Sequence, residues 1–379
     1  MTSSQAGERG PSRPGRDPWI ELDRSALVAN VRAVRERCGD RPVMAVVKAN
    51  AYGHGLAEMA TALAADGIQH FMVAKLDEAR ALREAGIEGM VLNAGPFDED
   101  RAEDVIRLGV SQAVFDDRYM LLGRVAAALG LAAHVQVKVD TGLRRLGVPH
   151  ETAPRLLEAL AATPGILLDG VFTTLSEDVE RDRAQLNRLR AVCEAASARG
   201  IAVGLRHAAS SAAVADPPED LSALDLVRPG VLLYGLYPSE RAERERAIHV
   251  RPVLSLKVRV HQVRALALGD SVGYHGRFVA SRDERVAVLP IGYADGYPSA
   301  LAGRGHALLG GRRCPIVAVF ANTTVVLLGD GRCAVGDVAV LIGRQDGTEM
   351  TASEVARSTE SSPYAVATML SPLLRRLVV

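Results

Sequence analysis

Between residues 43 and 235, short runs of apolar and β-branched residues alternate with longer stretches rich in Ala, Leu, Arg and Glu. The short runs have the composition of buried strands, and the longer stretches repeat their apolar positions with the period of a helix. Most of the helical stretches end in Gly, a common helix stop. The strand-like runs are residues 43–47, 70–74, 90–93, 112–115, 134–139, 168–173, 204–207 and 224–228.

Eight strands that are each followed by a helix favour a parallel (β/α)8 barrel of the TIM type. Because periodicity does not prove that a sheet closes, an open doubly wound sheet is the alternative. After about residue 240 the pattern changes to β-runs such as VLSLKVRVHQV and RVAVLPIGY, separated by Gly-rich turns. We therefore expect an α/β barrel over residues 17–245 and a mostly β domain over residues 246–379.

The N-terminal part of the chain carries two further signals. Residues 19–39 predict a short strand and then a helix ahead of the barrel, and that strand is a candidate to pair with the β domain. Residues 1–16 lack an apolar signal-peptide core, and no later stretch is long and apolar enough to span a bilayer. We expect a disordered tail on a cytoplasmic protein.

Charge and cysteine content narrow the classes of partner. The 45 basic and 45 acidic residues cancel, which argues against nucleic acid and anionic membranes and favours small neutral or zwitterionic ligands. The four cysteines have no CxxC spacing, so neither a disulfide framework nor a metal site is expected. They are Cys38, Cys193, Cys314 and Cys333.

Lysine is scarce in this chain, with only four among the 45 basic residues: Lys48, Lys75, Lys138 and Lys257. A compositional bias towards Arg explains most of the surface. It does not explain why Lys48 and Lys138 each end an apolar strand-like run. A chain that uses Arg wherever charge suffices is expected to keep Lys where an amine must be able to lose its proton.

Lys48 lies in the stretch AVVKANAYGHG, residues 45–55. Functional side chains of an α/β barrel lie at the carboxyl ends of its strands, and Lys48 ends the first one. The alternative is a lysine whose stem lies on apolar surface while its amine reaches solvent. The two glycines that follow, which let backbone approach a ligand, and the polar tips of Tyr52 and His54 favour a site.

The loops after strands seven and eight of a barrel commonly bind phosphate. Here they are HAASSAA (207–213), with hydroxyls at Ser210 and Ser211, and RPGVLLYG (228–235), in which Gly230 leaves backbone N–H groups free. Either segment alone is a weak signal, since Ser and Gly after a strand usually form a turn. Together with Lys48 they predict a phosphorylated aldehyde cofactor, pyridoxal 5'-phosphate, held as a Schiff base.

Five segments in this order carry a family resemblance: AVVKANAYGHG (45–55), KVDTGLRRLG (138–147), VRPGVLLYG (227–235), SVGYHG (271–276) and IGYADGY (291–297). The chain resembles the alanine racemases, which are fold-type III pyridoxal phosphate enzymes, from about residue 19 to residue 379. The resemblance implies a racemase for alanine or another small amino acid, working as a homodimer with shared active sites.

The resemblance also implies roles for residues around the cofactor. Lys48 would form the Schiff base and act as the base on one face of the substrate. Arg228 would lie against the pyridine nitrogen, where it cannot give up a proton, so that transamination is disfavoured relative to loss and return of the α-proton. The residues implied for the phosphate are Tyr52, Ser211, Gly230, Val231 and Tyr364.

Other implied roles concern the substrate. Lys138 resembles a lysine that is carbamylated in many members, where the new anion orients the neighbouring arginine, here Arg145, towards the substrate carboxylate. The alternative for Lys138 is an unmodified amine paired to Asp140. The alternative for Arg145 is an ordinary surface charge. Tyr274, from the second subunit, would be the base on the opposite face, and two bases on opposite faces account for racemisation. Tyr293 would line the entrance.

Three departures from the family pattern cover five positions. Thr174 stands where the family has the histidine of a Thr-His-Phe sequence. Residues 321–323, Ala-Asn-Thr, replace a Cys-Met-Asp loop, although the main-chain N–H of Asn322 could still bind the substrate carboxylate. Leu373 replaces an arginine. Either these are neutral changes in a working racemase, or the side of the site that Tyr274 serves, the tyrosine face, has changed to accept another substrate or to give another product.

The rebuilt-face alternative includes epimerisation of a larger amino acid, decarboxylation and retro-aldol cleavage. Arg228 and the RPGV sequence argue against decarboxylation, and the absence of a His near Cys333 argues against a metal-dependent aldolase. A non-catalytic cofactor carrier is the remaining alternative, but residues 246–379, including Tyr274, would have no purpose in it.

Overall fold

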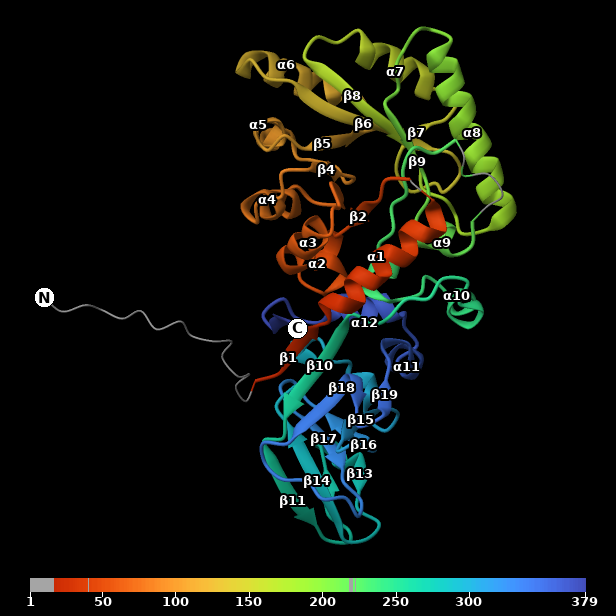
Figure 1. Ribbon diagram of the computed structural model, residues 1–379. Coiled ribbons are helices and arrows are strands. Elements are labelled where there is room, and N and C mark those ends of the chain that lie inside the picture. The colour runs from red at the N-terminus through yellow and green to blue at the C-terminus, as the bar shows by residue number, and fades with distance from the viewer. Residues whose placement is uncertain (1–16, 40, 218–220, 222) are drawn as a thin grey trace, which may run out of the picture. The chain divides into compact units, whose positions relative to one another are not determined.

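The computed structural model describes residues 17–379 except 40, 218–220 and 222 (Figure 1). The tail expected over residues 1–16 lies outside the described residues. The chain forms two compact units. The barrel unit comprises Leu22–Val253, Pro363–Thr368 and Val378–Val379, and the β unit comprises residues 17–21, Leu254–Ser362 and Met369–Leu377. Within the described residues, no helix combines the length and apolar character needed to cross a membrane.

The barrel unit is built on parallel strands that neighbour one another in chain order. They are β2 (Met44–Val46), β3 (His70–Val73), β4 (Met90–Asn93), β5 (Ser111–Val114), β6 (Ala133–Asp140), β8 (Ile166–Phe172) and β9 (Leu205–His207), with the short β7 (Val148–Pro149) pairing beside β6. They fall within a residue or two of the predicted runs, since strands buried in a parallel barrel read as continuous apolar stretches.

The sheet closes through two residues of the predicted eighth strand. Leu226 forms a parallel bridge with His207, and Val227 forms one with Val43. The Val227 carbonyl accepts the Met44 N–H at 2.8 Å, and the Val227 N–H donates to the Pro42 carbonyl at 3.0 Å. The barrel is therefore confirmed, and the open sheet is wrong.

Helices connect the strands of the barrel, as the helical period of the intervening stretches predicts (Figure 1). The apolar faces of the longer ones are buried, and Asp23 and Asp178 cap α1 and α8 by accepting backbone N–H bonds. The helices are α1 (Arg24–Cys38), α2 (Lys48–Tyr52), α3 (Leu56–Ala65), α4 (Leu76–Glu84), α5 (Ala102–Arg107), α6 (Tyr119–Leu129), α7 (Ala153–Ala161), α8 (Val179–Ser197), α9 (Ser211–Ala215) and α10 (Glu240–Glu245), with 3-10 turns η1 (Glu99–Arg101) and η2 (Val231–Tyr234).

The β unit contains a sheet in the order β11-β14-β17-β16-β15-β18-β10-β1-β20, with β19 paired to β18. Strand β1 (Trp19–Leu22) lies between β10 and β20, which confirms that the N-terminal strand joins the β domain. The other strands are β10 (Leu254–Arg259), β11 (Gln262–Leu266), β14 (Glu284–Leu289), β15 (His306–Leu309), β16 (Arg312–Val319), β17 (Thr324–Leu327), β18 (Val338–Gln345), β19 (Thr348–Met350) and β20 (Arg375–Val378).

Smaller elements complete the β unit. Strands β12 (Ser271–Val272) and β13 (Phe278–Val279) form a separate hairpin around the 3-10 turn η3 (Tyr274–Gly276). The remaining elements are η4 (Tyr293–Asp295), η5 (Ser299–Leu301), α11 (Ala352–Ser358) and α12 (Pro363–Met369), most of which belongs to the barrel unit.

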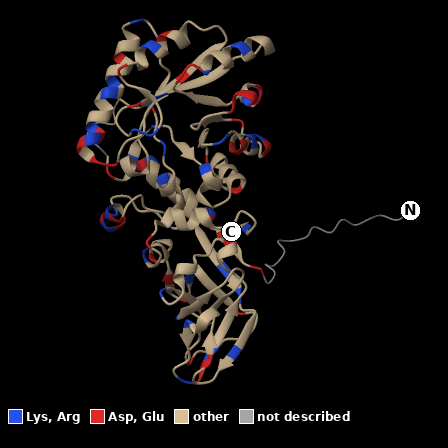
Figure 2. Cartoon of the chain, turned by 180° about the vertical axis from the view of Figure 1, so that it is seen from behind, with Lys and Arg blue, Asp and Glu red and all other residues tan. Residues whose placement is uncertain are grey.

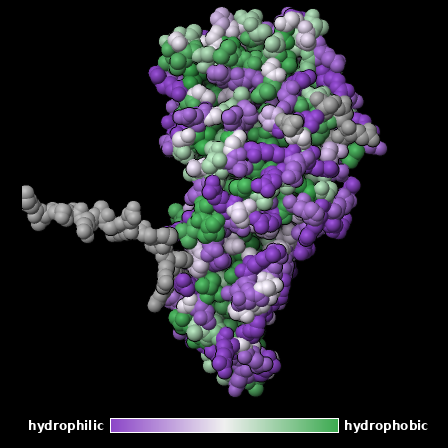
Figure 3. Space-filling view, viewed as in Figure 1, coloured by the Kyte–Doolittle hydropathy of each residue, from purple (hydrophilic) through white to green (hydrophobic). Residues whose placement is uncertain are grey.

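The charged residues that the structure describes do not gather by sign in the view of Figure 2. Basic and acidic residues are interspersed in both units (Figure 2). Hydrophilic side chains cover much of the face seen in Figure 3, with hydrophobic residues scattered between them. This distribution agrees with the zero formal net charge of the chain.

Candidate active site

Lys48 follows β2 and begins an unusual turn. Residues 49–52 all have φ between 51° and 55°, four consecutive residues in the left-handed region with no glycine among them. An L-residue there costs roughly 1–2 kcal/mol, so this turn persists only because its surroundings enforce it. It brings the Lys48 amine to 5.8 Å from the centre of the Tyr52 ring. The positive φ values thus begin at Ala49, ahead of the two glycines that suggested a close approach of backbone to a ligand.

The far end of the turn is held by backbone and side-chain contacts. Gly53 donates its N–H to the Ala49 carbonyl at 3.0 Å, and a Cβ on Gly53 would lie 1.8 Å from the Ala367 carbonyl oxygen of α12, so only glycine fits. The Asn50 side chain accepts the Leu56 N–H at 2.7 Å and so starts α3. The Lys48 turn is therefore tied to both α3 and α12.

His54 and Tyr234 form a buried pair beneath the turn. Their rings stack with centroids 4.6 Å apart, and the Tyr234 hydroxyl donates to the Val46 carbonyl at 3.0 Å. This fixes the end of β2 immediately before Lys48. The His54 ring is fully buried, with Nδ1 3.0 Å from the Tyr52 carbonyl, so it packs against the turn and is not an exposed polar tip.

A set of hydrogen-bond donors gathers after β9 and after the barrel-closing residues. The buried Ser211 hydroxyl accepts the Gly230 N–H at 2.9 Å and the Leu232 N–H at 3.4 Å. A Cβ built on Gly230 would lie 2.9 Å from the Tyr52 hydroxyl, so that phenol is next to the same segment. The Ser211 oxygen accepts these two N–H groups and keeps its own hydroxyl proton to donate, and hydroxyl donors at the carboxyl ends of barrel strands suit a phosphate.

Two more of the implied phosphate residues lie in this part of the barrel unit. Val231 is buried at the start of η2, and Tyr364, in α12, is 39% exposed. Burial, with a smaller contribution from Tyr364, raises the pKa of Tyr52 to about 12. The Tyr52 phenol therefore keeps its proton at neutral pH and can donate a hydrogen bond to an anion.

Arg228 is buried directly after the residues that close the barrel. Its guanidinium donates to His207 Nδ1 at 2.8 Å, to the Thr173 carbonyl at 2.6 Å and to the Ala208 carbonyl at 2.9 Å. Burial lowers the pKa of Arg228 to about 9, which is still above neutral pH, so the group stays charged. Its orientation is fixed by three partners from two strand ends.

His207 and Gln136, which the sequence analysis missed, set the proton positions beside Arg228. Gln136 Oε1 accepts from His207 Nε2 at 2.7 Å, which leaves His207 Nδ1 free to accept from Arg228. Burial, reinforced by the charge of Arg228, lowers the pKa of His207 well below its usual range. The imidazole is therefore neutral and acts as an acceptor for the arginine.

Lys138 and Arg145 add positive charge to the same site. Lys138 is buried, and its amine lies 5.7 Å from the centre of the Phe172 ring, over which Arg228 also lies at 5.2 Å. Burial, then the charges of Arg145, Arg228 and Lys48, lower the pKa of Lys138 to about 8. Asp140 forms its ion pair with Arg144 at 3.6 Å. A cluster of cations of this kind favours an anionic ligand.

Lys48 is subject to the same field. Burial lowers its pKa first, Arg145 and Arg228 lower it further, and Glu78 raises it. Loss of a proton from this amine is therefore easier than from an exposed lysine, which is the property expected of a base or nucleophile.

Thr174 lies in a segment fastened to α8. Its carbonyl accepts from Gln185 at 3.0 Å, and the next-but-one residue, Ser176, donates its N–H to Asp182 at 2.8 Å. Thr173 donates its hydroxyl to the Val139 carbonyl at 2.8 Å. The segment after β8 is thus rigidly held, although Thr174 offers no aromatic ring.

The remaining implied residues lie in the β unit. Tyr274 is 79% exposed and packs edge-on against Phe320, with ring centres 5.8 Å apart. The Tyr293 N–H donates to the Phe320 carbonyl at 3.0 Å, which brings its turn beside the segment that carries the exposed Asn322. Leu373 is 92% exposed. The structure thus groups Tyr274, Tyr293 and Asn322 within this unit.

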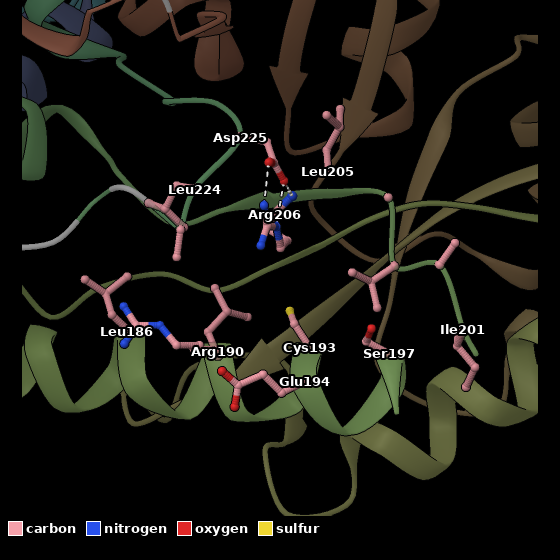
Figure 4. A pocket seen from close by; sticks show the side chains of 15 residues that line it. Leu186, Arg190, Cys193, Glu194, Ser197, Ile201, Leu205, Arg206, Leu224 and Asp225 are labelled. Atoms are coloured by element: carbon pink, nitrogen blue, oxygen red, sulfur yellow. Dashed lines mark hydrogen bonds and ion pairs between the residues drawn. The ribbon is translucent and has the colours of Figure 1, made fainter. Parts of the chain in front are cut away.

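A cavity of about 740 Å³ lies elsewhere in the barrel unit, between α8 and the start of β9 (Figure 4). Arg206 and Asp225 form an ion pair at its edge, at 2.8 Å, and Cys193 points into it. Burial raises the pKa of Cys193 to about 11, so its thiol is protonated and unreactive at neutral pH. The cavity borders the amino end of β9, away from the catalytic edge of a barrel.

Sequence comparisons give the chain a family. The sequence profile of the alanine racemase N-terminal domain matches residues 22–238, and that of the alanine racemase C-terminal domain matches residues 253–378. The alanine racemase of Symbiobacterium thermophilum is 37% identical, over 93% of this chain and 94% of its own. That of Carboxydothermus hydrogenoformans is 36% identical, over 96% of this chain and 100% of its own.

Solved structures agree with the sequences. The alanine racemase from D-cycloserine-producing Streptomyces lavendulae superposes with a TM-score of 0.91 at 30% identity, covering 97% of this chain and 98% of its own. The alanine racemase from Bacillus anthracis with bound L-Ala-P gives a TM-score of 0.87 at 28% identity, covering 97% and 96%. The chain therefore belongs to the alanine racemase family, the fold-type III pyridoxal phosphate-dependent amino-acid racemases.

Proposed function

We propose that this protein interconverts L- and D-alanine, with Lys48 holding pyridoxal 5'-phosphate. The observation that carries the proposal is the convergence of Lys48, Arg228 and the Ser211 donor set at the carboxyl ends of the barrel strands. The relatives named alanine racemase match nearly the whole chain, including the β unit, which supports alanine as the substrate over a carrier role.

The residues present fit the cofactor. The Ser211 hydroxyl, whose oxygen accepts the Gly230 N–H and whose own proton can be donated, the Tyr52 phenol and the Val231 N–H, with Gly230 and Tyr364 beside them, would hold the phosphate. Lys48 would bind the aldehyde carbon, and Arg228 would face the pyridine nitrogen. When bound, the cofactor supplies an electron sink that makes the α-proton of an attached amino acid acidic.

Arg228 sets the strength of that sink. The guanidinium donates to His207 Nδ1 and to the Thr173 and Ala208 carbonyls, and these three bonds hold the group charged and in place. A guanidinium is too weak an acid to hand over its proton, so negative charge stays near the α-carbon and the proton returns there quickly. This favours racemisation over transamination.

Two bases on opposite faces of the substrate account for racemisation. Lys48, whose pKa is lowered chiefly by burial, would move the proton on one face. We propose a homodimer in which the partner's Tyr274 moves the proton on the other face. The 79% exposure of Tyr274 and its packing on Phe320 present the phenol at the surface of the β unit, as delivery to a neighbouring subunit would require.

Substrate recognition would use the remaining polar groups. Arg145 is exposed beside Lys48 and Lys138 and would attract the amino-acid carboxylate. The main-chain N–H of Asn322 of the partner subunit would contact the same carboxylate, and Tyr293 would narrow the entrance.

We predict that Lys138 takes up CO2 to form a carbamate. With a pKa lowered to about 8, roughly half of its amine is neutral at pH 8, against less than about 1% of an ordinary lysine. The amine loses one proton as its nitrogen bonds to CO2, and the resulting anion offsets the nearby cations. Protein equilibrated with 13C-labelled CO2 should show a carbamate NMR signal that grows from pH 7 to pH 9 at fixed dissolved CO2.

The matched control for this measurement is Lys75→Arg, which removes an exposed lysine and should keep the signal. Lys138→Ala should lose it. A wild-type spectrum without a carbamate signal across this pH range would show that Lys138 remains a free amine.

Gly230→Ala should weaken cofactor binding by about tenfold or more. At Gly230 the backbone φ of −121° and ψ of −86° lie outside the main regions that L-residues adopt, and the nearest atom to an added Cβ is the Tyr52 hydroxyl, 2.9 Å away. Absorbance titration of the cofactor-free protein measures the dissociation constant. If the effect comes from displaced Tyr52, then Tyr52→Phe and Gly230→Ala together should cost less than the sum of the two single changes. Additive effects would contradict this cause.

Complementation and a chiral assay test the proposed function itself. The gene should allow D-alanine auxotrophic cells to grow without D-alanine, and the purified, cofactor-loaded protein should convert L-alanine to the D-form as measured by chiral chromatography. Lys48→Ala provides the negative control. Soluble, loaded protein that leaves alanine unchanged but racemises another amino acid would show that the substrate, and not the reaction, is wrongly assigned.

A further inference from the structure

A single carboxylate, that of Glu78, joins the ends of two neighbouring barrel strands. One of its oxygens accepts the Ala49 N–H at 2.6 Å, immediately after β2. The other accepts the Ala74 N–H at 3.0 Å and the Lys75 N–H at 3.2 Å, immediately after β3. Glu78 lies in the first turn of α4. It therefore ties the segment that follows Lys48 to α4 and to the end of β3.

The N–H that Glu78 accepts belongs to the first residue of the left-handed turn, Ala49. Ala49 is the first of the four residues with φ near 50°, and its N–H precedes the turn's own hydrogen bonds. The far end is held by Asn50 and Gly53, as described above. The near end has one hydrogen bond of its own, from the Ala51 N–H to the Val47 carbonyl at 2.8 Å, and Glu78 adds the acceptor for the Ala49 N–H. Without that second restraint the near end would relax more readily towards an ordinary conformation, and the backbone of Lys48 would move with it.

Glu78 also supplies the negative charge acting on Lys48. The charged groups around this amine come from several elements: Arg145 from the loop after β6, Arg228 from the segment that closes the barrel, Lys138 from β6 and Glu78 from α4. The first two lower the pKa of Lys48, and Glu78 raises it. Loss of the Glu78 charge should shift the Lys48 equilibrium towards the neutral amine.

We propose that Glu78 is a positioning residue for Lys48, which fixes the strained turn and thereby the direction of the amine. The proposal rests on the proposed role of Lys48 as the cofactor-binding lysine. It does not require that Glu78 touch cofactor or substrate. Its predicted effect is therefore on the turnover and on the protonation of the Lys48 nitrogen, with little effect on substrate binding.

The test compares Glu78→Gln with Asp77→Asn in the cofactor-loaded protein. Glutamine keeps the size of Glu78 but has only one acceptor oxygen, whereas the backbone N–H donors come from two strand ends. At the second strand end the glutamine NH2 group would meet a backbone N–H, and two donors cannot form a hydrogen bond. Asp77 is the neighbouring residue in the same helical turn and pairs only with Arg101, at 2.7 Å, among the described ion pairs. Both changes remove one negative charge from the start of α4.

Three quantities are measured for each variant: kcat and KM for alanine, the pH midpoint of the visible band of the lysine-bound cofactor, and the thermal midpoint of unfolding. Glu78→Gln should lower kcat by about tenfold to 100-fold with KM changed less than about threefold. The spectral midpoint should move to lower pH, because the charge that favoured the protonated nitrogen is gone. Asp77→Asn should leave the kcat and the spectral midpoint near wild type.

A second change separates positioning from simple loss of a helix cap. Ala49→Gly allows the left-handed conformation at no steric cost, so in the Glu78→Gln background it should restore at least about threefold in kcat. A helix cap defect in α4 would not respond to glycine at residue 49. If Glu78→Gln does not accumulate as folded protein, Glu78→Asp is used, since it keeps the charge but is too short to reach both strand ends.

The proposal is overturned if Glu78→Gln lowers only the thermal midpoint while kcat and the spectral midpoint remain near wild type. It is also overturned if Asp77→Asn shifts the spectral midpoint equally. Loss of any negative charge at the start of α4 would then explain the shift, without the hydrogen bonds of Glu78. The spectral readout needs no substrate. A protein that binds cofactor at Lys48 but does not racemise alanine would therefore refute the proposed function while still testing Glu78.

Discussion

Lys48→Ala should abolish racemisation, with kcat for alanine at least about 1,000-fold below wild type. The change removes both the amine that holds the cofactor and the base on one face of the substrate, and each role alone is typically worth about 100-fold or more. The visible band of the lysine-bound cofactor should also disappear. Enzyme assays and absorbance spectra of the same preparation measure the two effects.

The matched control is Lys75→Ala, because Lys75 is an exposed lysine whose side chain has no place in the site. It should retain wild-type spectrum and rate. The fold should survive Lys48→Ala, since the Lys48 side chain is half-buried and the turn is held by Glu78, Asn50 and Gly53. A Lys48→Ala protein that kept the band or more than a few per cent of the activity would show that another lysine binds the cofactor.

Tyr274→Phe should lower racemisation by about 100-fold to 10,000-fold in both directions, because each direction needs a proton moved on both faces. Exchange of the α-proton with deuterium should behave differently. The Lys48 face remains intact, so one enantiomer of alanine should still exchange in heavy water while keeping its configuration, and the other should exchange slowly. NMR of each enantiomer measures the α-proton exchange, and chiral chromatography of the same sample measures the racemisation.

His275→Asn is the control for this loop. His275 is exposed, neighbours Tyr274 and has a φ of 63°, which asparagine tolerates. It should racemise alanine at close to the wild-type rate. If Tyr274→Phe slowed exchange of both enantiomers equally, the two-base division between Lys48 and Tyr274 would be wrong.

The barrel was predictable because its strands are buried on both faces and read as apolar runs separated by helical stretches. Closure was not predictable from periodicity. It depends on two isolated bridges, made by Leu226 and Val227 of the predicted eighth strand to residues distant in the sequence. The N-terminal strand could be recognised, but its neighbours β10 and β20 are far away in the sequence.

The site was predictable where a residue type carries the chemistry, as with Lys48 ending a strand and Gly230 opening a turn. It was not predictable where tertiary structure overrides local preference. Nothing in Ala-Asn-Ala-Tyr indicates four left-handed residues, and Ala is poorly suited to that conformation. Glu78, His207 and Gln136 were missed because each acts through a partner that is distant in the sequence.

The departure at Thr174 has a structural setting that the sequence could not give. The Thr174 carbonyl, and not its side chain, is what the fold uses, through Gln185 of α8. Arg228 is oriented by His207 and two carbonyls, one of them that of Thr173, so its position does not depend on a ring at residue 174. The hydrogen bonds that orient Arg228 therefore do not use the side chain of residue 174.

One measurement tests the central claim most directly. Cofactor-loaded protein is incubated with L-alanine in heavy water, the α-proton signal is followed by NMR, and the alanine is then separated by chirality. We predict that the α-proton is replaced by deuterium while the sample approaches equal amounts of L- and D-alanine. Alanine that keeps its α-proton and its configuration, or that is consumed to a keto acid, would contradict the assignment.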